Sequence, residues 1–412
     1  MHTIVHEGLV DEAFIASRTI GYEELRKNVE GYSPEAMAPV CGIDAETTKW
    51  AARLYAKSKA SIIFWGMGIS QHIHGTDNAR CLIALCLMTG QVGRPGTGLH
   101  PLRGQNNVQG ASDSGLIPIV YPDYQFVDDP KAQAKFEKLW GASLDPQRGL
   151  TVVEIMQAVL AGEIRGMYIM GENPAMSDPD AHHAREALAA LDWLVVQEIF
   201  LTETCYHADV ILPATAWPEK SGTVTNTDRM VQRGRQALQP PGDAKPDLWI
   251  IQELARRLGL DWNYRGPEDV FNEMRLAMTS IAGITWERLE AESAVTYPCV
   301  QEGDPGEPVV FIENFPTATG KARFVPADII PAAERPDAEY PMILITGRQL
   351  EHWHTGAMTR RSGVLDAIEP DAVASLNPAD LARLKVNPGE VISVQSRRGA
   401  VSLYARADDG TP

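Results

Sequence analysis

The chain has 412 residues, of which 44% are hydrophobic and 22% charged, and its formal net charge is −17 at pH 7. This composition is that of a soluble globular protein with enough apolar residues for two or three domains. The negative charge argues against nucleic acid and anionic membrane as the main partners. No apolar run reaches the length of a membrane span and no signal-peptide pattern opens the sequence, so we expect a cytoplasmic protein.

The five cysteines do not have the spacing of a metal site. No two of them form a Cys-x-x-Cys pair, and Cys81 and Cys86 lie in an apolar stretch that is typical of a helix. Free cysteines in such a stretch are usually buried and inert. We therefore expect that these cysteines form no zinc site and that this chain does not ligate an iron–sulfur cluster by itself.

Short apolar strands alternate with helices between residues 60 and 215. The predicted strands are 60–65, 166–170, 193–197 and 208–212. Helices are expected over 75–88 and 182–190. This alternation predicts a parallel α/β sheet with its ligands at the carboxyl ends of the strands.

Residues 99–115 combine side-chain amides, one guanidinium and several glycines with few apolar side chains. A core helix or strand is not expected from this composition. Flexible backbone beside fixed donors and acceptors suits a long loop around a large polar ligand or an anionic substrate. A solvated turn is the alternative, and it is the more common one for shorter segments.

The pattern changes twice after residue 240. Residues 240–282 are predicted to be helical, and proline and glycine crowd residues 298–341 as in a connection between domains. Strands are then predicted over 341–346, 390–395 and 400–404, with a hairpin turn at 396–399.

These patterns predict three consecutive segments. They are an α/β region over 1–240, a helical segment and connection over 241–340, and a β-rich, barrel-like domain over 341–412. Asn377 is expected to cap a short helix in the third segment.

Residues 103–110 (RGQNNVQG) resemble the signature loop of molybdenum- or tungsten-dependent formate dehydrogenases of the molybdopterin oxidoreductase family. Supporting matches cover essentially the whole chain: 65–71 (WGMGISQ), 90–96 (GQVGRPG), 171–174 (GENP), 208–213 (ADVILP), 219–226 (EKSGTVTN) and 346–348 (TGR). The later motifs are shared across the wider family, whereas the Asn-Asn-Val-Gln-Gly loop favours formate over nitrate.

The resemblance implies molybdenum or tungsten held by two pyranopterin guanine dinucleotides, one in each half of the protein. Diphosphates favour backbone N–H groups at glycine turns, and guanine favours Asp, Asn or Gln side chains. The residues predicted to bind this cofactor are Gly66, Met67, Gly68, Gln71, Gln105, Gly171, Glu172, Asn173, Thr202, Thr204, Asp209, Gly222, Thr223, Asn226, Arg229, Gly347, Arg348 and Asn377. Capping and turn roles are the alternative for Asp209, Asn226, Asn377, Thr202 and Thr204.

Formate must be held against the metal while its hydrogen and electrons leave. A rigid guanidinium holds a carboxylate better than a flexible amine, and the arginine that matches Arg103 binds substrate in the resembling enzymes. We therefore predict Arg103 as the catalytic, formate-binding residue and Gln105 as a second substrate contact, with a surface salt bridge as the alternative for Arg103. His72 and His74 are further candidates, for which a structural role is the alternative.

The family's metal-binding cysteine or selenocysteine, the histidine after it and the cluster cysteines have no counterpart in this sequence. Cys41, for example, is followed by Gly42 and Ile43. The sequence is therefore interpreted as an interior fragment of a formate dehydrogenase large (alpha) subunit, inactive alone, whose missing N-terminal part carries a 4Fe–4S cluster.

The implied partners are formate, CO2 and electron-transfer subunits. Two alternatives remain, namely another molybdopterin oxidoreductase such as an assimilatory nitrate reductase, and a non-catalytic homologous subunit. The motifs do not distinguish molybdenum from tungsten, or one electron acceptor from another.

Overall fold

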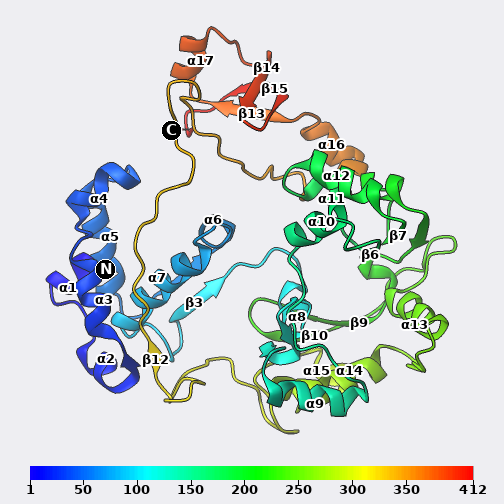
Figure 1. Cartoon of the computed structure of the whole chain (residues 1–412). Helices are drawn as coiled ribbons and strands as arrows, with labels where there is room; N and C mark the ends of the chain where they lie inside the picture. Colours follow the sequence, from blue (N-terminus) through cyan, green and yellow to red (C-terminus); the bar gives the residue numbers. More distant parts are fainter. Residues whose placement is uncertain (412) are drawn as a thin grey trace. The chain divides into compact units, whose positions relative to one another are not determined.

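The computed structural model describes residues 1–411, which divide into two compact units (Figure 1). Unit 1 consists of Met1–Gly149, Trp217–Gln239 and Ile251–Pro331. Unit 2 consists of Leu150–Ala216, Pro240–Ile250 and Ala332–Pro412. This grouping by contacts differs in kind from the three consecutive segments predicted above, whose boundaries stay a prediction. Within residues 1–411, no helix is both long and apolar enough to pass through a lipid bilayer.

Unit 1 begins with five helices, four of which contribute to one apolar core. They are α1 (His2–His6), α2 (Glu12–Arg18), α3 (Tyr22–Val29), α4 (Pro34–Cys41) and α5 (Ala45–Lys57). Side chains of Asp11, Ser33 and Asp44 each accept a first-turn backbone hydrogen bond and so begin α2, α4 and α5. Ile4 of α1 and Leu25 of α3 are almost fully buried in the shared core.

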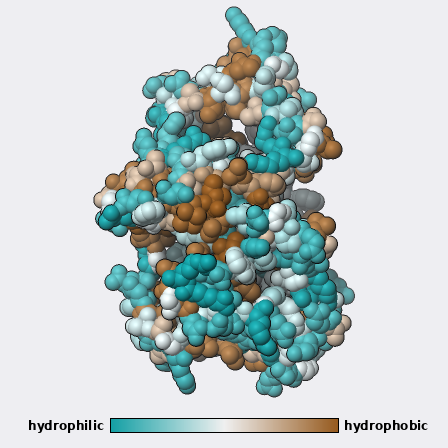
Figure 2. All heavy atoms as spheres, turned by 90° about the vertical axis from the view of Figure 1, so that its right-hand side faces the viewer, coloured by the Kyte–Doolittle hydropathy of each residue, from teal (hydrophilic) through white to brown (hydrophobic). Residues whose placement is uncertain are grey.

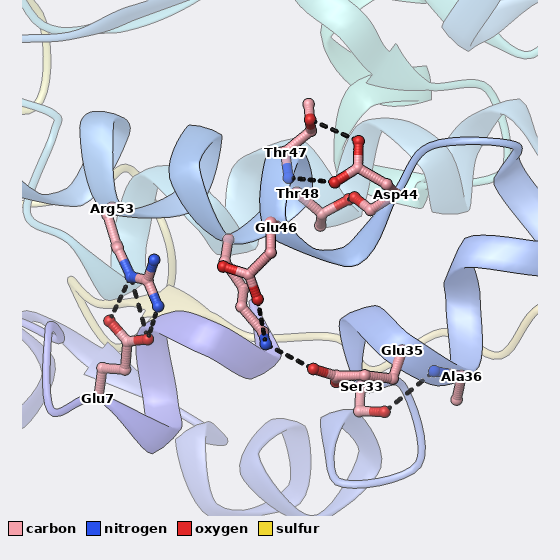
Figure 3. A network of polar contacts seen from close by, with 10 residues as sticks. Glu7, Ser33, Glu35, Ala36, Asp44, Glu46, Thr47, Thr48 and Arg53 are labelled. Atoms are coloured by element: carbon pink, nitrogen blue, oxygen red, sulfur yellow. Dashed lines mark hydrogen bonds and ion pairs between the residues drawn. The ribbon is translucent and has the colours of Figure 1, made fainter.

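Polar contacts join the surface of α5 to its neighbours (Figure 3). Arg53 donates from Nε and Nη2 to both carboxylate oxygens of Glu7, over distances of 2.7–3.1 Å. Lys49 forms ion pairs with Glu35 of α4 and with Glu46. Exposed ion pairs of this kind add little to stability, so the apolar core dominates the stability of this helical group.

A second apolar core of unit 1 contains Phe136, Phe271 and Leu289, and the remaining elements of the unit pack partly around it and partly against the first core. The helices are α6 (Met67–Ser70), α7 (Gly75–Met88), α8 (Val108–Asp113), α9 (Pro130–Trp140), α14 (Pro267–Ala277) and α15 (Trp286–Glu292), with 3₁₀ turns η1 (Pro122–Tyr124), η3 (Trp217–Glu219) and η4 (Thr279–Ile281). The strands are β1 (Thr19–Ile20), β2 (Ile62–Trp65), β3 (Gly98–Pro101), β4 (Val120–Tyr121), β5 (Gln125–Phe126), β9 (Gly222–Thr225), β10 (Met230–Gly234), β11 (Ala294–Thr296) and β12 (Ala322–Arg323). β1–β12 and β2–β3 are parallel pairs, β4–β5 is antiparallel, and β11-β10-β9 is an antiparallel sheet.

Unit 2 is built on a parallel sheet of order β6-β7-β8. The strands are β6 (Gly166–Met170), β7 (Trp193–Glu198) and β8 (Val210–Pro213), and the helices near them are α10 (Val152–Leu160), α11 (Pro174–Ser177) and α12 (Ala181–Ala190) (Figure 1). The 3₁₀ turn η2 (Glu203–His207) connects β7 to β8, and α13 (Asp247–Arg257) begins in unit 2. Leu188 and Leu194 lie in the core of this sheet.

The C-terminal part of unit 2 holds a β-rich region. Its elements are η5 (Thr359–Arg361), α16 (Gly363–Ile368), β13 (Val373–Leu376), α17 (Pro378–Leu384), β14 (Val391–Ser396) and β15 (Gly399–Ala407). β15 pairs in parallel with β13 and antiparallel with β14, which confirms the predicted hairpin. The Asn377 side chain accepts a hydrogen bond from the N–H of Ala379 at 3.0 Å, so the predicted cap is also confirmed.

The fold class is confirmed as α/β with parallel sheets and a β-rich C-terminal region, and the predicted strands and helices between 60 and 212 are present. The single parallel sheet over 60–215 is wrong, because β2 pairs with β3 in unit 1 while β6, β7 and β8 form their own sheet in unit 2. Local hydrophobic periodicity identifies a strand but does not identify its neighbour.

Two further corrections concern segments whose structure was predicted from their content of apolar residues. The segment 99–115 is not a continuous loop, because β3 ends within it and α8 follows. The strand predicted over 341–346 is also wrong: these residues pair with no other strand in the described chain, and Ile343 and Ile345 are both 73% exposed. A strand needs a neighbour to satisfy its backbone, which an apolar run alone does not supply. Of the two cysteines predicted to be buried, Cys86 is buried and Cys81 is half-buried.

Large apolar side chains remain exposed in both units, and Figure 2 shows apolar residues among polar ones on one face of the molecule. On β2 and the turn after it, Phe64 and Met67 are 57% and 49% exposed. Exposed apolar groups beside a polar glycine-containing turn are typical of a ligand-binding surface.

Candidate functional site

Arg103 lies where the chain leaves β3 and turns toward α8. Its Nη1 is 3.4 Å from the hydroxyl oxygen of Ser112 on α8. Its Nε is buried and has no hydrogen-bond partner within residues 1–411. Leaving a buried donor unpaired costs about 1–3 kcal/mol, and more when the group is charged. Arg103 therefore presents an N–H group that an anionic ligand would satisfy.

The helix after Arg103 is anchored by a buried carboxylate. Asp113 is 3% exposed, and its two oxygens accept hydrogen bonds at 2.6 Å from the Gln109 amide and the Tyr297 hydroxyl. Burial, together with the hydrogen bond to Asp113, holds the pKa of Tyr297 well above its usual range. Tyr297 directly follows β11, so this pair fastens α8 to the antiparallel sheet of unit 1.

Two other residues of the 103–110 motif have structural roles. The Asn107 side-chain oxygen accepts a hydrogen bond from the backbone N–H of Thr225 at 2.8 Å. A Cβ atom on Gly110 would lie 2.3 Å from that same oxygen and 3.1 Å from Thr225 Cβ. Glycine at 110 therefore lets α8 approach β9 closely. A cavity of about 190 Å³ beside this contact is lined by Thr223, a predicted cofactor residue, and by Phe271 of α14.

Several glycines predicted to bind the cofactor differ from Gly110 in the space around their backbone. Gly66, Gly68 and Gly222 have no left-handed backbone, and no protein atom lies within 4 Å of the Cβ that each could carry. By contrast, a Cβ on Gly75 would meet the carbonyl oxygen of Ser70 at 1.8 Å. The fold thus requires glycine at 75 but not at 66, 68 or 222. Open backbone at these three positions fits a cofactor that approaches the main chain closely.

The turn that contains Gly66 and Gly68 is closed by local hydrogen bonds. Trp65 Nε1 donates to Ser70 Oγ at 3.1 Å, and a ring nitrogen of His72 lies 2.8 Å from the carbonyl oxygen of Gly68. This contact gives His72 a structural role. The predicted residue Gln71 is exposed at the end of α6, and His74 directly precedes α7.

Asn226 and Arg229 shape the hairpin between β9 and β10. The Asn226 side-chain oxygen accepts hydrogen bonds from the N–H groups of Asp228 and Met230, each at 3.0 Å. Arg229 donates to the carbonyl oxygens of Tyr297 and Glu307, and burial lowers its pKa. Both side chains therefore have partners within unit 1, and their predicted cofactor contacts stay a prediction.

In unit 2, Gly171 ends β6 with a left-handed backbone, and Asn173 follows it in a buried position. The Asn173 amide donates to Glu203 at 2.8 Å, and its oxygen accepts from both the N–H and the hydroxyl of Thr204, at 3.2 and 2.8 Å. The Thr204 hydroxyl oxygen in turn accepts from Ala175 N–H at 3.1 Å. These side chains hydrogen-bond to each other and hold the backbone around Gly171 in place.

Asp209 lies at the other edge of this sheet. It precedes β8, and its carboxylate accepts a hydrogen bond from the N–H of Leu194 at 2.7 Å, near the start of β7. Thr202, by contrast, follows β7, where its hydroxyl oxygen is 3.5 Å from Cys205 Sγ. The sequence predicts ligands at the carboxyl ends of the strands. Asp209 departs from this prediction, because a residue before a parallel strand lies at the amino edge, whereas Thr202 and Gly171 follow their strands at the carboxyl edge.

The carboxyl edge does gather charged residues from distant parts of the chain. Burial lowers the pKa of His354, the charge of Arg348 lowers it further, and the charge of Glu172 at this edge opposes the shift. Arg348 also lies 5.7 Å from the centre of the Trp353 ring. Gly347, like Gly66, faces open space.

Sequence reasoning missed Arg361. Its guanidinium donates to the carbonyl oxygen of Leu201 at 2.7 Å and lies 4.9 Å from the centre of the Phe200 ring. The only signal for it was an adjacent pair of arginines in a turn. The predicted Asn377 has a structural role, because its amide also donates to the carbonyl oxygen of Thr411 at 2.9 Å.

The comparisons with known proteins agree on the family. Residues 1–257 match the family model for molybdopterin oxidoreductases, and residues 342–412 match the molybdopterin dinucleotide binding domain. The alpha subunit of the F420-dependent formate dehydrogenase of Methanocaldococcus jannaschii is 43% identical over 408 residues, which is 98% of this chain and 60% of that protein. Formate dehydrogenase H of Escherichia coli is 39% identical over 412 residues, which is 99% of this chain and 58% of that protein.

A solved structure shares the fold. Acetylene hydratase from Pelobacter acetylenicus superposes with a TM-score of 0.74 at 21% identity, over 100% of this chain and 60% of that chain. The chain spans about 60% of the length of the two relatives named above. Because one family model covers the greater part of the sequence and the second covers its C-terminal region, the chain belongs to the molybdopterin oxidoreductase family.

Proposed function

We propose that this chain is the formate-binding part of a formate dehydrogenase alpha subunit, in a protein that oxidises formate to CO2 or runs the reverse reaction. The similar proteins named as formate dehydrogenases support this proposal. The observation that carries it is the buried, unpartnered Nε of Arg103 inside the RGQNNVQG loop. A second candidate is an assimilatory nitrate reductase, which the wider family motifs also fit.

Arg103 would hold the substrate carboxylate. A guanidinium offers two parallel N–H donors in one plane, so it fixes both oxygens of formate and prevents the anion from pivoting. The contact between α8 and the β9–β11 sheet, through Asp113 and Tyr297, would keep the loop in place while formate binds. Gln105, which is exposed in the same loop, is proposed as a second contact to substrate or cofactor.

The residues present fit a molybdopterin guanine dinucleotide. In unit 1 the open backbone at Gly66, Gly68 and Gly222 would take its phosphates, and in unit 2 the backbone of Gly171 with the Arg348 guanidinium would do the same. When bound, the metal and its pterins supply the acceptor for the two electrons of formate. The other predicted cofactor residues remain proposed contacts through their side chains or backbone.

We propose that the rest of the machinery lies outside this sequence. The longer relatives leave room for a further segment that supplies a metal-binding cysteine or selenocysteine and a 4Fe–4S cluster. Separate subunits would carry the electrons onward, and the reaction would take place in the cytoplasm. The choice of molybdenum or tungsten is left to measurement.

The test is turnover by the protein in the form that its own gene encodes. It is expressed in a host that makes the dinucleotide cofactor, purified without oxygen, and assayed for formate-dependent reduction of a viologen dye. Formate oxidation without nitrate reduction is the expected result. Nitrate reduction by reduced viologen would favour the second candidate, and cofactor-loaded protein that is inactive in both assays would indicate a non-catalytic subunit.

A further inference from the structure

Two histidines and a glutamate meet on the surface of the N-terminal helical group of unit 1. His2 and His6 are four residues apart on α1, and their rings stack with centroids 4.0 Å apart. Glu30 directly follows α3, and its Oε2 is 3.0 Å from His6 Nε2. One ligand atom from each of the three residues lies within 4.8 Å of the other two.

This donor set and spacing match the needs of a divalent transition metal. Two imidazoles and a carboxylate are common zinc ligands, and histidines at i and i+4 face the same side of a helix. Ligand atoms around a tetrahedral zinc ion with bonds of about 2.0–2.1 Å are ~3.3 Å apart. Small rotations of the three side chains would therefore bring them to bonding distance without moving the backbone.

The backbone that carries the three ligands is well packed. Ile4, between the two histidines in sequence, is fully buried, and Leu25 and Val29 of α3 are almost fully buried in the same core. Arg53 of α5 holds Glu7 at the end of α1, as Figure 3 shows. Because α1 and α3 are fixed by this core, the ligands keep their spacing when no ion is bound.

Glu30 can bind a metal through one oxygen while the other contacts an arginine. Arg26 Nη1 is 3.9 Å from Oε1 of Glu30, the oxygen that does not face His6. Glu30 can therefore offer Oε2 to a metal and keep its contact with Arg26. His6 and Glu30 are 45% and 47% exposed, which leaves room for a water ligand.

We propose that His2, His6 and Glu30 form a binding site for a divalent metal ion of the zinc class, which links α1 to α3. Water completes the tetrahedral coordination. The site holds no group that Arg103 or the proposed cofactor residues use, and it lies on elements that the proposed function does not involve. It is therefore a structural clamp that is independent of formate turnover.

The experiment uses the full protein, produced without a polyhistidine tag and treated with a chelator, then titrated with Zn²⁺ and with Co²⁺. We expect one ion per chain at this site, the visible bands of tetrahedral Co²⁺, and a higher melting temperature with Zn²⁺. Mg²⁺ is expected to give none of these effects, because the site offers imidazole nitrogen rather than oxygen alone.

The variants are His6→Ala and Glu30→Gln, with His183→Ala on α12 as the matched control. His6→Ala and Glu30→Gln each remove a proposed ligand atom, so they are expected to weaken Zn²⁺ binding by at least ~10- to 100-fold, the loss found when only a hydrogen-bond partner of a metal ligand is removed. The control keeps wild-type affinity, and all three keep formate turnover. Glu30 is exposed, so Glu30→Gln is expected to fold and still tests the metal site if His6→Ala folds poorly. The proposal is overturned if the wild type shows no saturable binding or if both variants bind Zn²⁺ as tightly as the wild type.

Discussion

The RGQNNVQG loop of unit 1 and the carboxyl edge of the β6–β8 sheet in unit 2 have similarly polar sequences, yet their side chains do different things. In the loop, Arg103 keeps a buried N–H without a partner. At the sheet edge, Asn173 and Thr204 satisfy each other and Glu203. Residue type therefore does not reveal whether a polar side chain faces a ligand or holds the backbone that does. An unsatisfied buried donor is the stronger indication of a ligand, because native structures contain few of them.

The largest expected effect comes from Arg103→Lys in the cofactor-loaded protein. An ammonium is a point charge that does not reproduce the planar pair of N–H donors. Losing one charge-assisted hydrogen bond of about 1.5–3 kcal/mol corresponds to roughly ten- to more than a hundredfold in rate. Steady-state formate kinetics and metal content are measured on the same sample, and the metal content is expected to stay near that of the wild type.

Arg265→Lys is the control for this substitution. The Arg265 side chain is 88% exposed and pairs with Asp269 of α14, so formate turnover should not change. Near-normal turnover in Arg103→Lys would show that Arg103 is structural, and the formate contact would then have to be sought elsewhere in the loop.

The second prediction concerns stability in unit 2. Asn173→Ala removes an amide that bonds both Glu203 and Thr204, and it leaves the N–H and the hydroxyl proton of the buried Thr204 without their acceptor. We expect a loss of about 1–3 kcal/mol in the free energy of unfolding, measured by urea denaturation. Asn106→Ala is the matched control in the unit 1 loop, because Asn106 is exposed there. Its stability should change by no more than about 0.5 kcal/mol. Equal losses in the two variants would contradict the difference between the regions.

The third prediction separates two kinds of glycine within unit 1. In Gly110→Ala the new Cβ meets the Asn107 oxygen at 2.3 Å and Thr225 Cβ at 3.1 Å, so either Asn107 gives up its hydrogen bond from Thr225 or α8 moves away from β9, at a cost of about 1–3 kcal/mol in stability. In Gly66→Ala the new Cβ enters open space, so the unfolding free energy should be nearly unchanged while the bound dinucleotide content falls. Denaturation and cofactor analysis of both variants check this. Full cofactor content in Gly66→Ala would remove Gly66 from the proposed site.

The sequence predictions were accurate where the signal lay within a short stretch of sequence. Strand β6, helix α7 and the Asn377 cap were predictable because their patterns lie within a few neighbouring residues. Contacts between segments that are far apart in the sequence were not predictable. Nothing in the sequence reveals that β2 pairs with β3, that Asp209 holds the amino edge of its sheet, or that the polar segment around α8 is anchored by Asp113 and not by apolar burial.

The site was predictable to the same extent. The motif located Arg103, but only the structure shows that its Nε lacks a partner. The same applies to the sheet edge, where Asn173 of a family motif and Thr204, predicted as a cofactor contact, are hydrogen-bonded to each other. Arg361 carried no motif at all, because its position beside Phe200 depends on how the C-terminal segment of unit 2 packs.

The smallest expected effect is a pH dependence of the Asn173→Ala stability difference. The hydrogen bond from Asn173 is the main cause that lowers the pKa of the Glu203 carboxyl. A carboxyl whose pKa is lower in the folded state stabilises the fold above its unfolded pKa of about 4.3, and this contribution is lost as the pH falls through the folded pKa. Asn173→Ala removes the contribution, so the gap in urea midpoint between wild type and variant should be widest near neutral pH and narrow below about pH 4. The gap does not close, because the bonds to Thr204 are uncharged and persist in acid. Other carboxyls titrate equally in the wild type and the variant, so their effects cancel in the difference. A gap in urea midpoint that stays constant from pH 7 down into acid would show that Asn173 acts through Thr204 alone.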